Sequence, residues 1–101
     1  MARLINRDGK TILAVVGDRI CGPQRDPIAK LDGRCVSTLS GDSIGNVTSR
    51  GRFMDGVVSE LVVVGLELRD SMGPLIGRFE NATPMERGLL ALVYGQLVVG
   101  R

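Results

Sequence analysis

Residues 13–20 read Leu13-Ala14-Val15-Val16-Gly17-Asp18-Arg19-Ile20, which is a short apolar run, a glycine turn and a return to apolar residues. Short apolar runs bounded by Gly and Asp are typical of β-strands joined by tight turns. The first four residues follow the pattern apolar, small, any, apolar, which occurs five times in the chain. The copies begin at Leu13, Ile28, Ile44, Val58 and Ile76. Their starts lie 14 to 18 residues apart, which predicts a repeat of about sixteen residues.

Turn residues flank these copies on both sides. Before them stand the acidic turns Asp8-Gly9, Asp26-Pro27, Gly41-Asp42, Asp55-Gly56 and Asp70-Ser71-Met72-Gly73. After the first four stand Gly17, Gly33, Gly51 and Gly65. Glycine beside Asp supplies the positive φ that a hairpin reversal needs. Each unit is therefore expected to run strand, acidic turn, strand, glycine turn.

Five such units predict a mainly β fold. We expect about five tandem β-hairpin units forming a small barrel-like or radial antiparallel array, plus one C-terminal α-helix at about residues 84–98. A chain of 101 residues has room for a single core. Residues 1–101 are therefore expected to form one domain, with hairpin repeats at 1–82 and, at 83–101, the helix packing on them or on a partner subunit.

The helix has the most specific local signal, a capping box at Thr83-Pro84-Met85-Glu86. Its apolar residues, which surround most of the circumference, are Met85, Leu89, Leu90, Leu92, Val93, Leu97 and Val98. A helix without a clean polar face must be buried, either threaded into a β-barrel or packed against a second copy in an oligomer. Small residues at Gly88, Ala91 and Gly95 favour close approach of another backbone.

The uninterrupted apolar run Leu61-Val62-Val63-Val64 predicts a strand that is buried on both faces, beneath the helix or in a subunit interface. Together with the apolar helix, this run predicts a homo-oligomer. The expected interface residues are Leu89, Leu92, Val93, Leu97, Val62 and Val64.

The composition argues against several classes of function. A net charge of +2, with basic and acidic residues interleaved, lacks the basic face of a nucleic-acid-binding protein. The chain has no His, and its two cysteines, Cys21 and Cys35, lack metal-site spacing. We therefore expect no metal site, no cofactor and no defined catalytic residues. Free thiols and an opening without a signal peptide predict a cytoplasmic protein, and the apolar stretches are too short to span a membrane.

Three arginines follow glycine turns in successive units, namely Arg19, Arg34 and Arg52. A closed array would bring them to one rim, where guanidinium groups can hold a carboxylate or a phosphorylated ligand. The alternative is that each arginine pairs with a nearby carboxylate, such as Asp18 or Asp32, and keeps the rim soluble.

Two segments carry a family resemblance. Gly51-Arg52-Phe53 and Leu75-Ile76-Gly77-Arg78-Phe79 resemble the bacterial β-flower proteins, small domains of tandem hairpins with no established activity. That resemblance covers roughly residues 3 to 80. The final helix resembles the one in the tubby and scramblase-like fold, in which a barrel of hairpins surrounds an apolar C-terminal helix. This second resemblance implies a lipid-binding role, although the chain is too short for the twelve-stranded version.

These observations predict a small non-enzymatic binding or assembly module that self-associates through its helix. One alternative is a small-ligand carrier or an enzyme, with a site in the barrel or between subunits. The other is a lipid-binding protein at a membrane surface.

Overall fold

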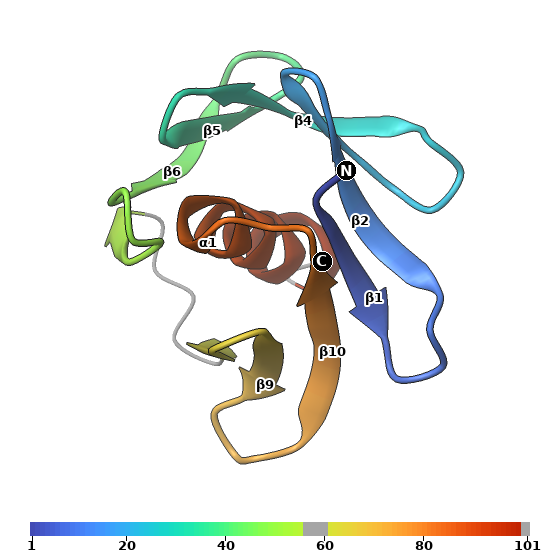
Figure 1. Ribbon diagram of the computed structural model, residues 1–101. Coiled ribbons are helices and arrows are strands. Elements are labelled where there is room, and N and C mark those ends of the chain that lie inside the picture. The colour runs from blue at the N-terminus through green and yellow to red at the C-terminus, as the bar shows by residue number, and fades with distance from the viewer. Residues whose placement is uncertain (56–60, 100–101) are drawn as a thin grey trace.

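Ten short strands and one C-terminal helix form the described part of the molecule. A computed structural model describes residues 1–55 and 61–99 of the chain (Figure 1). Within these residues the strands are β1 (Arg3–Asn6), β2 (Thr11–Val16), β3 (Arg19–Cys21), β4 (Pro27–Asp32), β5 (Cys35–Thr38), β6 (Ser43–Val47), β7 (Phe53–Asp55), β8 (Leu61–Val64), β9 (Glu67–Asp70) and β10 (Leu75–Glu80). They form one antiparallel sheet in the order β7-β6-β5-β4-β3-β2-β1-β10-β9-β8. The predicted mainly β fold with a C-terminal helix is confirmed.

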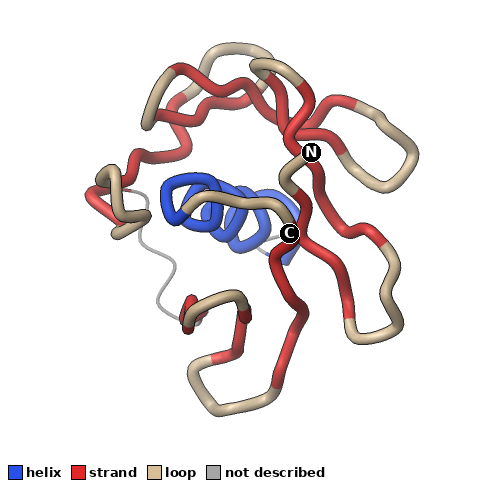
Figure 2. The backbone as a smooth tube through the Cα atoms, viewed as in Figure 1, coloured by secondary structure: helices blue, strands red, loops and turns tan. Residues whose placement is uncertain are grey.

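The sheet curves around a single helix. Strand β1 pairs with β10, so the first and last strands lie side by side and the two ends of the sheet are β7 and β8. Helix α1 (Pro84–Val93) lies in the centre of the ring of strands (Figures 1 and 2). No pairing joins β7 to β8 among the described residues, so the sheet is open there.

The repeat has a period of sixteen residues. Val15 pairs with Ile20, Leu31 with Val36, and Val63 with Leu68, in the same register each time. In this register Ile12 is equivalent to Ile28. The first copy of the pattern therefore begins at Ile12, one residue before its predicted start at Leu13. The sequence pattern allowed this error because both residues are apolar and neighbours. The fourth predicted copy, which begins at Val58, starts outside the described residues.

Two kinds of turn alternate along the chain. Two-residue turns lie at Gly17-Asp18, Gly33-Arg34 and Gly65-Leu66. Five-residue turns begin at Asn6, Gly22, Thr38 and Asp70, and in each the N–H of the first residue donates to the C=O of the fifth at 2.8–2.9 Å. The predicted turn at Asp55-Gly56 lies mostly outside the described residues. In the third unit, the five-residue turn Thr48–Arg52 stands where the other units have two residues.

The helix begins as its capping box predicts. Thr83 Oγ1 accepts a hydrogen bond from the Glu86 N–H at 3.2 Å, and Glu86 Oε1 accepts one from the Thr83 N–H at 2.9 Å. The α-helix ends at Val93 and continues as the π-helix η1 (Tyr94–Val99), so the predicted extent holds while the helix type changes at Tyr94. Burial raises the pKa of the Tyr94 hydroxyl above its ordinary value.

The chain's own strands bury the helix. Leu89, Leu92 and Val93 are at most 1% exposed and belong to one core cluster with strand residues such as Leu4 and Leu68. In this structure the helix packs on the strands of its own chain, and the predicted packing on a partner subunit stays a prediction. In this structure these three residues therefore offer no surface to a second copy, while Leu97 is half-buried.

Strand β8 differs from its prediction. Leu61 is buried and Val63 half-buried, but Val62 and Val64 are 41% and 53% exposed. Burial on both faces is therefore wrong for the single chain. The physical reason is that side chains alternate along a strand: Leu61 and Val63 pack on the core that contains α1, while Val62 and Val64 point to the other face and are exposed.

Candidate functional site

A basic pocket lies beside the start of α1, and we call it the three-arginine pocket. Its volume is about 280 Å³, and its lining consists of Arg50, Gly51, Arg52, Val63, Gly65, Pro84 and Arg87. These residues come from the β6–β7 turn, from β8 and the turn after it, and from the first turn of α1. Among the residues that the structure describes, the lining includes no acidic side chain. The pocket therefore concentrates positive charge at the break between the two ends of the sheet.

Two glycines hold the β6–β7 turn against the helix. A Cβ added to Gly51 would lie 2.0 Å from the Pro84 carbonyl oxygen, and one added to Gly88 would lie 2.3 Å from the Gly51 carbonyl oxygen. Gly51 also has a φ of 83°, which side chains rarely adopt. The backbones can meet this closely only because both residues lack a side chain. The small residue predicted at Gly88 thus meets the chain's own turn.

Thr48 fixes the position of the two arginines in this turn. Its side-chain oxygen accepts hydrogen bonds from the N–H groups of Arg50, at 3.2 Å, and Arg52, at 3.1 Å. The backbone closes the turn as well, because the Thr48 N–H donates to the Arg52 carbonyl oxygen at 2.8 Å. Arg50 and Arg52 therefore flank Gly51 on a well-defined backbone, and their side chains are exposed.

Arg87 completes the pocket from the helix side. Its Nη1 donates to the Gly65 carbonyl oxygen at 3.1 Å, which ties the β8–β9 turn to α1. The helix terminus itself offers few donors, since Pro84 has no N–H and the N–H of Glu86 is bonded to Thr83. The Glu86 carboxylate caps the helix by accepting from the Thr83 N–H. The guanidinium groups are therefore the main anion-binding groups here.

The three arginines of the predicted rim differ in their surroundings. All three lie at turns on one edge of the sheet, because every second turn of a meander lies at the same edge. They do not occupy equivalent positions, since the register aligns Arg19 with Cys35 and places Arg34 inside its turn. Arg19 pairs with Asp18 at 3.0 Å, which is the alternative expected for it. Only Arg52 lines the three-arginine pocket.

Sequence reasoning missed Arg50 and Arg87. Arg50 stands in the run Arg50-Gly51-Arg52, where two cations flank a single glycine. Arg87 stands in the first turn of α1, where the helix dipole disfavours a cation by about 0.3–1 kcal/mol. A cation at an unfavourable position is the signal that could have identified Arg87. What brings it to Arg52, however, is the tertiary contact between Gly51 and Gly88.

An open groove adjoins the pocket, and we call it the β10 groove. Its volume is about 870 Å³, and it is lined by Arg3, Leu66, Arg78, Phe79, Glu80, Asn81, Ala82 and Thr83. Gly65 and Pro84 line the pocket, while the adjacent residues Leu66 and Thr83 line the groove. Glu80 forms an ion pair with Arg3 at the groove wall. The two concave surfaces are therefore neighbours.

Comparison of the chain with known protein families, with curated proteins and with solved structures gave no match. The resemblances to β-flower proteins and to the tubby and scramblase-like fold therefore stay predictions. In the described part of the chain, no three His, Cys, Asp or Glu side chains gather into a possible metal site. None of the helices within residues 1–55 and 61–99 has the length and apolarity needed to cross a bilayer.

Proposed function

We propose that the protein is a non-enzymatic binding module that holds a small anionic ligand in the three-arginine pocket. The observation that supports this proposal is that Arg50, Arg52 and Arg87 all line one concavity, in which the described lining residues include no acidic side chain. Arginine binds carboxylates and phosphates well because its planar guanidinium presents several N–H donors in a fixed geometry.

The exposure of Arg50 and Arg52 limits the affinity. Solvent and salt weaken charge pairs at a surface, so each contact contributes about 1–2 kcal/mol. Three such contacts correspond to a Kd on the order of 1 mM for an anion without further groups. Binding should weaken as ionic strength rises, because counter-ions screen the arginines.

The test is calorimetric titration of the protein with inorganic phosphate at low ionic strength. Substituting Arg50→Gln, Arg52→Gln or Arg87→Gln one at a time removes one cation from the pocket. Each variant is expected to bind phosphate about tenfold more weakly, which corresponds to about 1.4 kcal/mol. Thermal unfolding of each variant shows that it remains folded.

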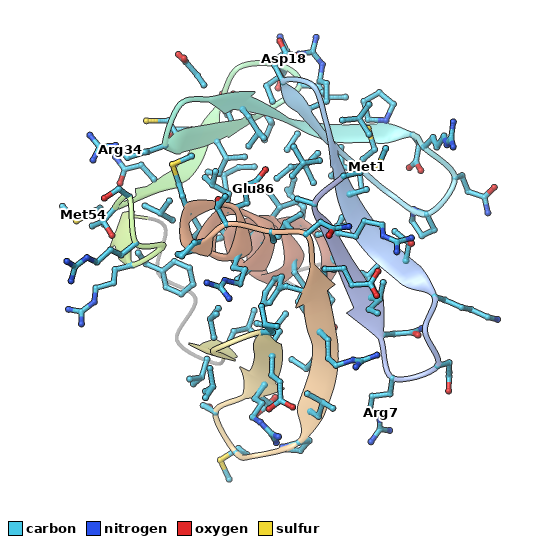
Figure 3. The ribbon with its side chains drawn as sticks, in the orientation of Figure 1. Met1, Arg7, Asp18, Arg34, Met54 and Glu86 are labelled. Carbon is cyan, nitrogen blue, oxygen red and sulfur yellow. The ribbon has the colours of Figure 1, made fainter. Side chains whose placement is uncertain are left out.

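Two matched controls make the result specific. Arg34→Gln removes a cation from another turn at the same edge, and Arg7→Gln removes one from the β1–β2 turn; Arg34 and Arg7 lie far apart in Figure 3. Both controls should bind phosphate as the unaltered protein does. No saturable binding, or equal weakening in all five variants, would contradict the proposal.

The proposal includes a barrel-like arrangement of the five units around α1. Its support is that, among the strands of residues 1–55 and 61–99, the pairing of β1 with β10 leaves one break in the sheet order, between β7 and β8. The three-arginine pocket lies at this break, since Arg52 precedes β7 and Val63 belongs to β8. A bound anion there would link the two ends of the sheet.

A second candidate function is self-association through the outer face of β8. Strand β8 is an end strand of the sheet, and Val62 and Val64 on it are exposed. Exposed apolar end strands are common sites of association with another chain. We expect sedimentation to show a dimer at micromolar concentration, and the double substitution Val62→Lys, Val64→Lys to give a monomer.

The control for self-association is Met72→Lys, at a position that is 88% exposed in the β9–β10 turn. This variant should sediment as the unaltered protein does. If the unaltered protein sediments as a monomer, the proposed self-association is wrong.

A further inference from the structure

We infer that the ligand of the three-arginine pocket is a soluble phosphate monoester whose organic group lies in the β10 groove. This inference rests on the proposed function, and it adds the chemical class of the ligand. Three observations support it: three arginines line the pocket, the exposed Leu66 lies beside the pocket, and the β10 groove adjoins the pocket.

Three guanidinium groups favour a phosphate over a carboxylate. A phosphate monoester presents three terminal oxygens and up to two negative charges, whereas a carboxylate presents two oxygens and one charge. Arg50, Arg52 and Arg87 approach the pocket from two different elements, the β6–β7 turn and α1. An anion with three terminal oxygens offers one acceptor for each of these three arginines.

Leu66 departs from the pattern of its turn. The second residue of the equivalent two-residue turns is Asp18 in the first unit and Arg34 in the second. In the fourth unit it is Leu66, which is 56% exposed and directly follows Gly65 of the pocket. An apolar side chain in a solvent-facing turn beside a cluster of cations is suited to contact the organic part of an anionic ligand.

The groove supplies the remaining contacts. Leu66 and Ala82 present apolar surface, and Asn81 and Thr83 present polar groups. The carboxylate of Glu80 pairs with Arg3, which reduces its repulsion of a neighbouring anion. The hydrogen bond from Arg87 to the Gly65 carbonyl oxygen lies at the boundary, so a phosphate bound to Arg87 would lie next to the groove.

The experiment compares three ligands by calorimetry: inorganic phosphate, phenyl phosphate and phenylacetate. Phenyl phosphate is expected to bind at least tenfold more tightly than inorganic phosphate, and phenylacetate more weakly than both. Leu66→Ser should abolish the advantage of phenyl phosphate and leave the affinity for inorganic phosphate unchanged. Leu39→Ser, at a 41% exposed leucine in the β5–β6 turn, is the matched control and should change neither affinity.

The outcomes separate the inference from the proposed function. If inorganic phosphate binds but phenyl phosphate gains nothing, or if Leu66→Ser has no effect, the inference is wrong and the anion site stands. Equal binding of phenylacetate and phenyl phosphate overturns the choice of phosphate. If none of the anions binds, the proposed function fails as well.

A final arm tests the source of the phosphate. Vesicles of phosphatidylcholine with added phosphatidic acid present the same monoester at a membrane surface. Binding of phenyl phosphate in solution, with no retention on these vesicles, supports a soluble ligand. Retention on the vesicles without binding of phenyl phosphate assigns the site to a lipid headgroup and overturns the inference.

Discussion

Single residues account for several departures from the sixteen-residue repeat. The fourth residue of a five-residue turn has positive φ, and it is glycine at Gly9, Gly41 and Gly73. The equivalent residue of the second unit is Arg25, with a φ of 61°. A side chain in the left-handed region costs about 1–2 kcal/mol, because Cβ crowds the following carbonyl oxygen. Arg25 is therefore a strained position in an otherwise regular turn.

Replacing this residue should stabilise the protein. Arg25→Gly relieves the crowding at Cβ, while the greater entropy of glycine in the unfolded chain offsets about 0.4–1 kcal/mol of the gain. We expect the free energy of unfolding to rise by up to about 1 kcal/mol, measured by urea denaturation. The control Arg7→Gly lies in the β1–β2 turn at a position without positive φ, and it should lower stability. If the Arg25→Gly protein is less stable than the unaltered one, a contact of the Arg25 side chain stabilises the fold by more than the positive φ costs.

At the scale of elements, the third unit is altered where it meets the helix. Its five-residue turn Thr48–Arg52 replaces a two-residue turn, and the extra residues allow Gly51 to reach Gly88 of α1. The pairing of β6 with β7 shifts register to accommodate the insertion. The same alteration carries Arg50 and Arg52 to the first turn of the helix. The packing of these elements and the basic pocket therefore have one structural origin.

Gly51→Ala tests this contact. The new Cβ would lie 2.0 Å from the Pro84 carbonyl oxygen, so the turn must move away from the helix. We expect the free energy of unfolding to fall by about 2–3 kcal/mol, and phosphate binding to weaken because Arg50 and Arg52 move with the turn.

Gly33→Ala is the matched control for Gly51→Ala. Gly33 has a φ of 60°, but nothing lies within 4 Å of an added Cβ. The free energy of unfolding of the Gly33→Ala variant should therefore fall by only about 1 kcal/mol, the cost of a side chain at positive φ. Its phosphate binding should be unchanged. Equal effects of the two substitutions would show that the close approach to Pro84 contributes nothing.

At the scale of the whole molecule, helix α1 supplies the second layer for the ten short strands that the structure describes. Strands of three to six residues bury little surface alone, and a sheet with one apolar face needs a second layer. The buried residues Leu89, Leu90 and Leu92 provide that layer, and their cluster includes residues from β1 through β10. Because strands from both ends of the chain pack on the same helix, we infer that the sheet and the helix fold together.

Local sequence patterns predicted much of the fold. Glycine and aspartate recur at turns because the backbone needs positive φ or side-chain bonding there, and both demands act within a few residues. The capping box of Thr83 and Glu86 is local in the same way. The one-residue error in the first copy arose because Leu13 and its neighbour Ile12 are both apolar, and only strand pairing distinguishes them.

Less of the candidate site could be predicted from the sequence. The sequence identified Arg52 but not Arg50 and Arg87, and Arg19 and Arg34 are not among the residues that line the pocket. Residues 50–52 and residue 87 are separated by more than thirty positions, and no local preference relates them. Local chemistry alone specified the strands, the turns and the start of the helix, because these depend on neighbours in the chain. Long-range packing decided that the apolar helix is buried in its own sheet and which arginines line one pocket. This packing includes the close approach of the Gly51 and Gly88 backbones.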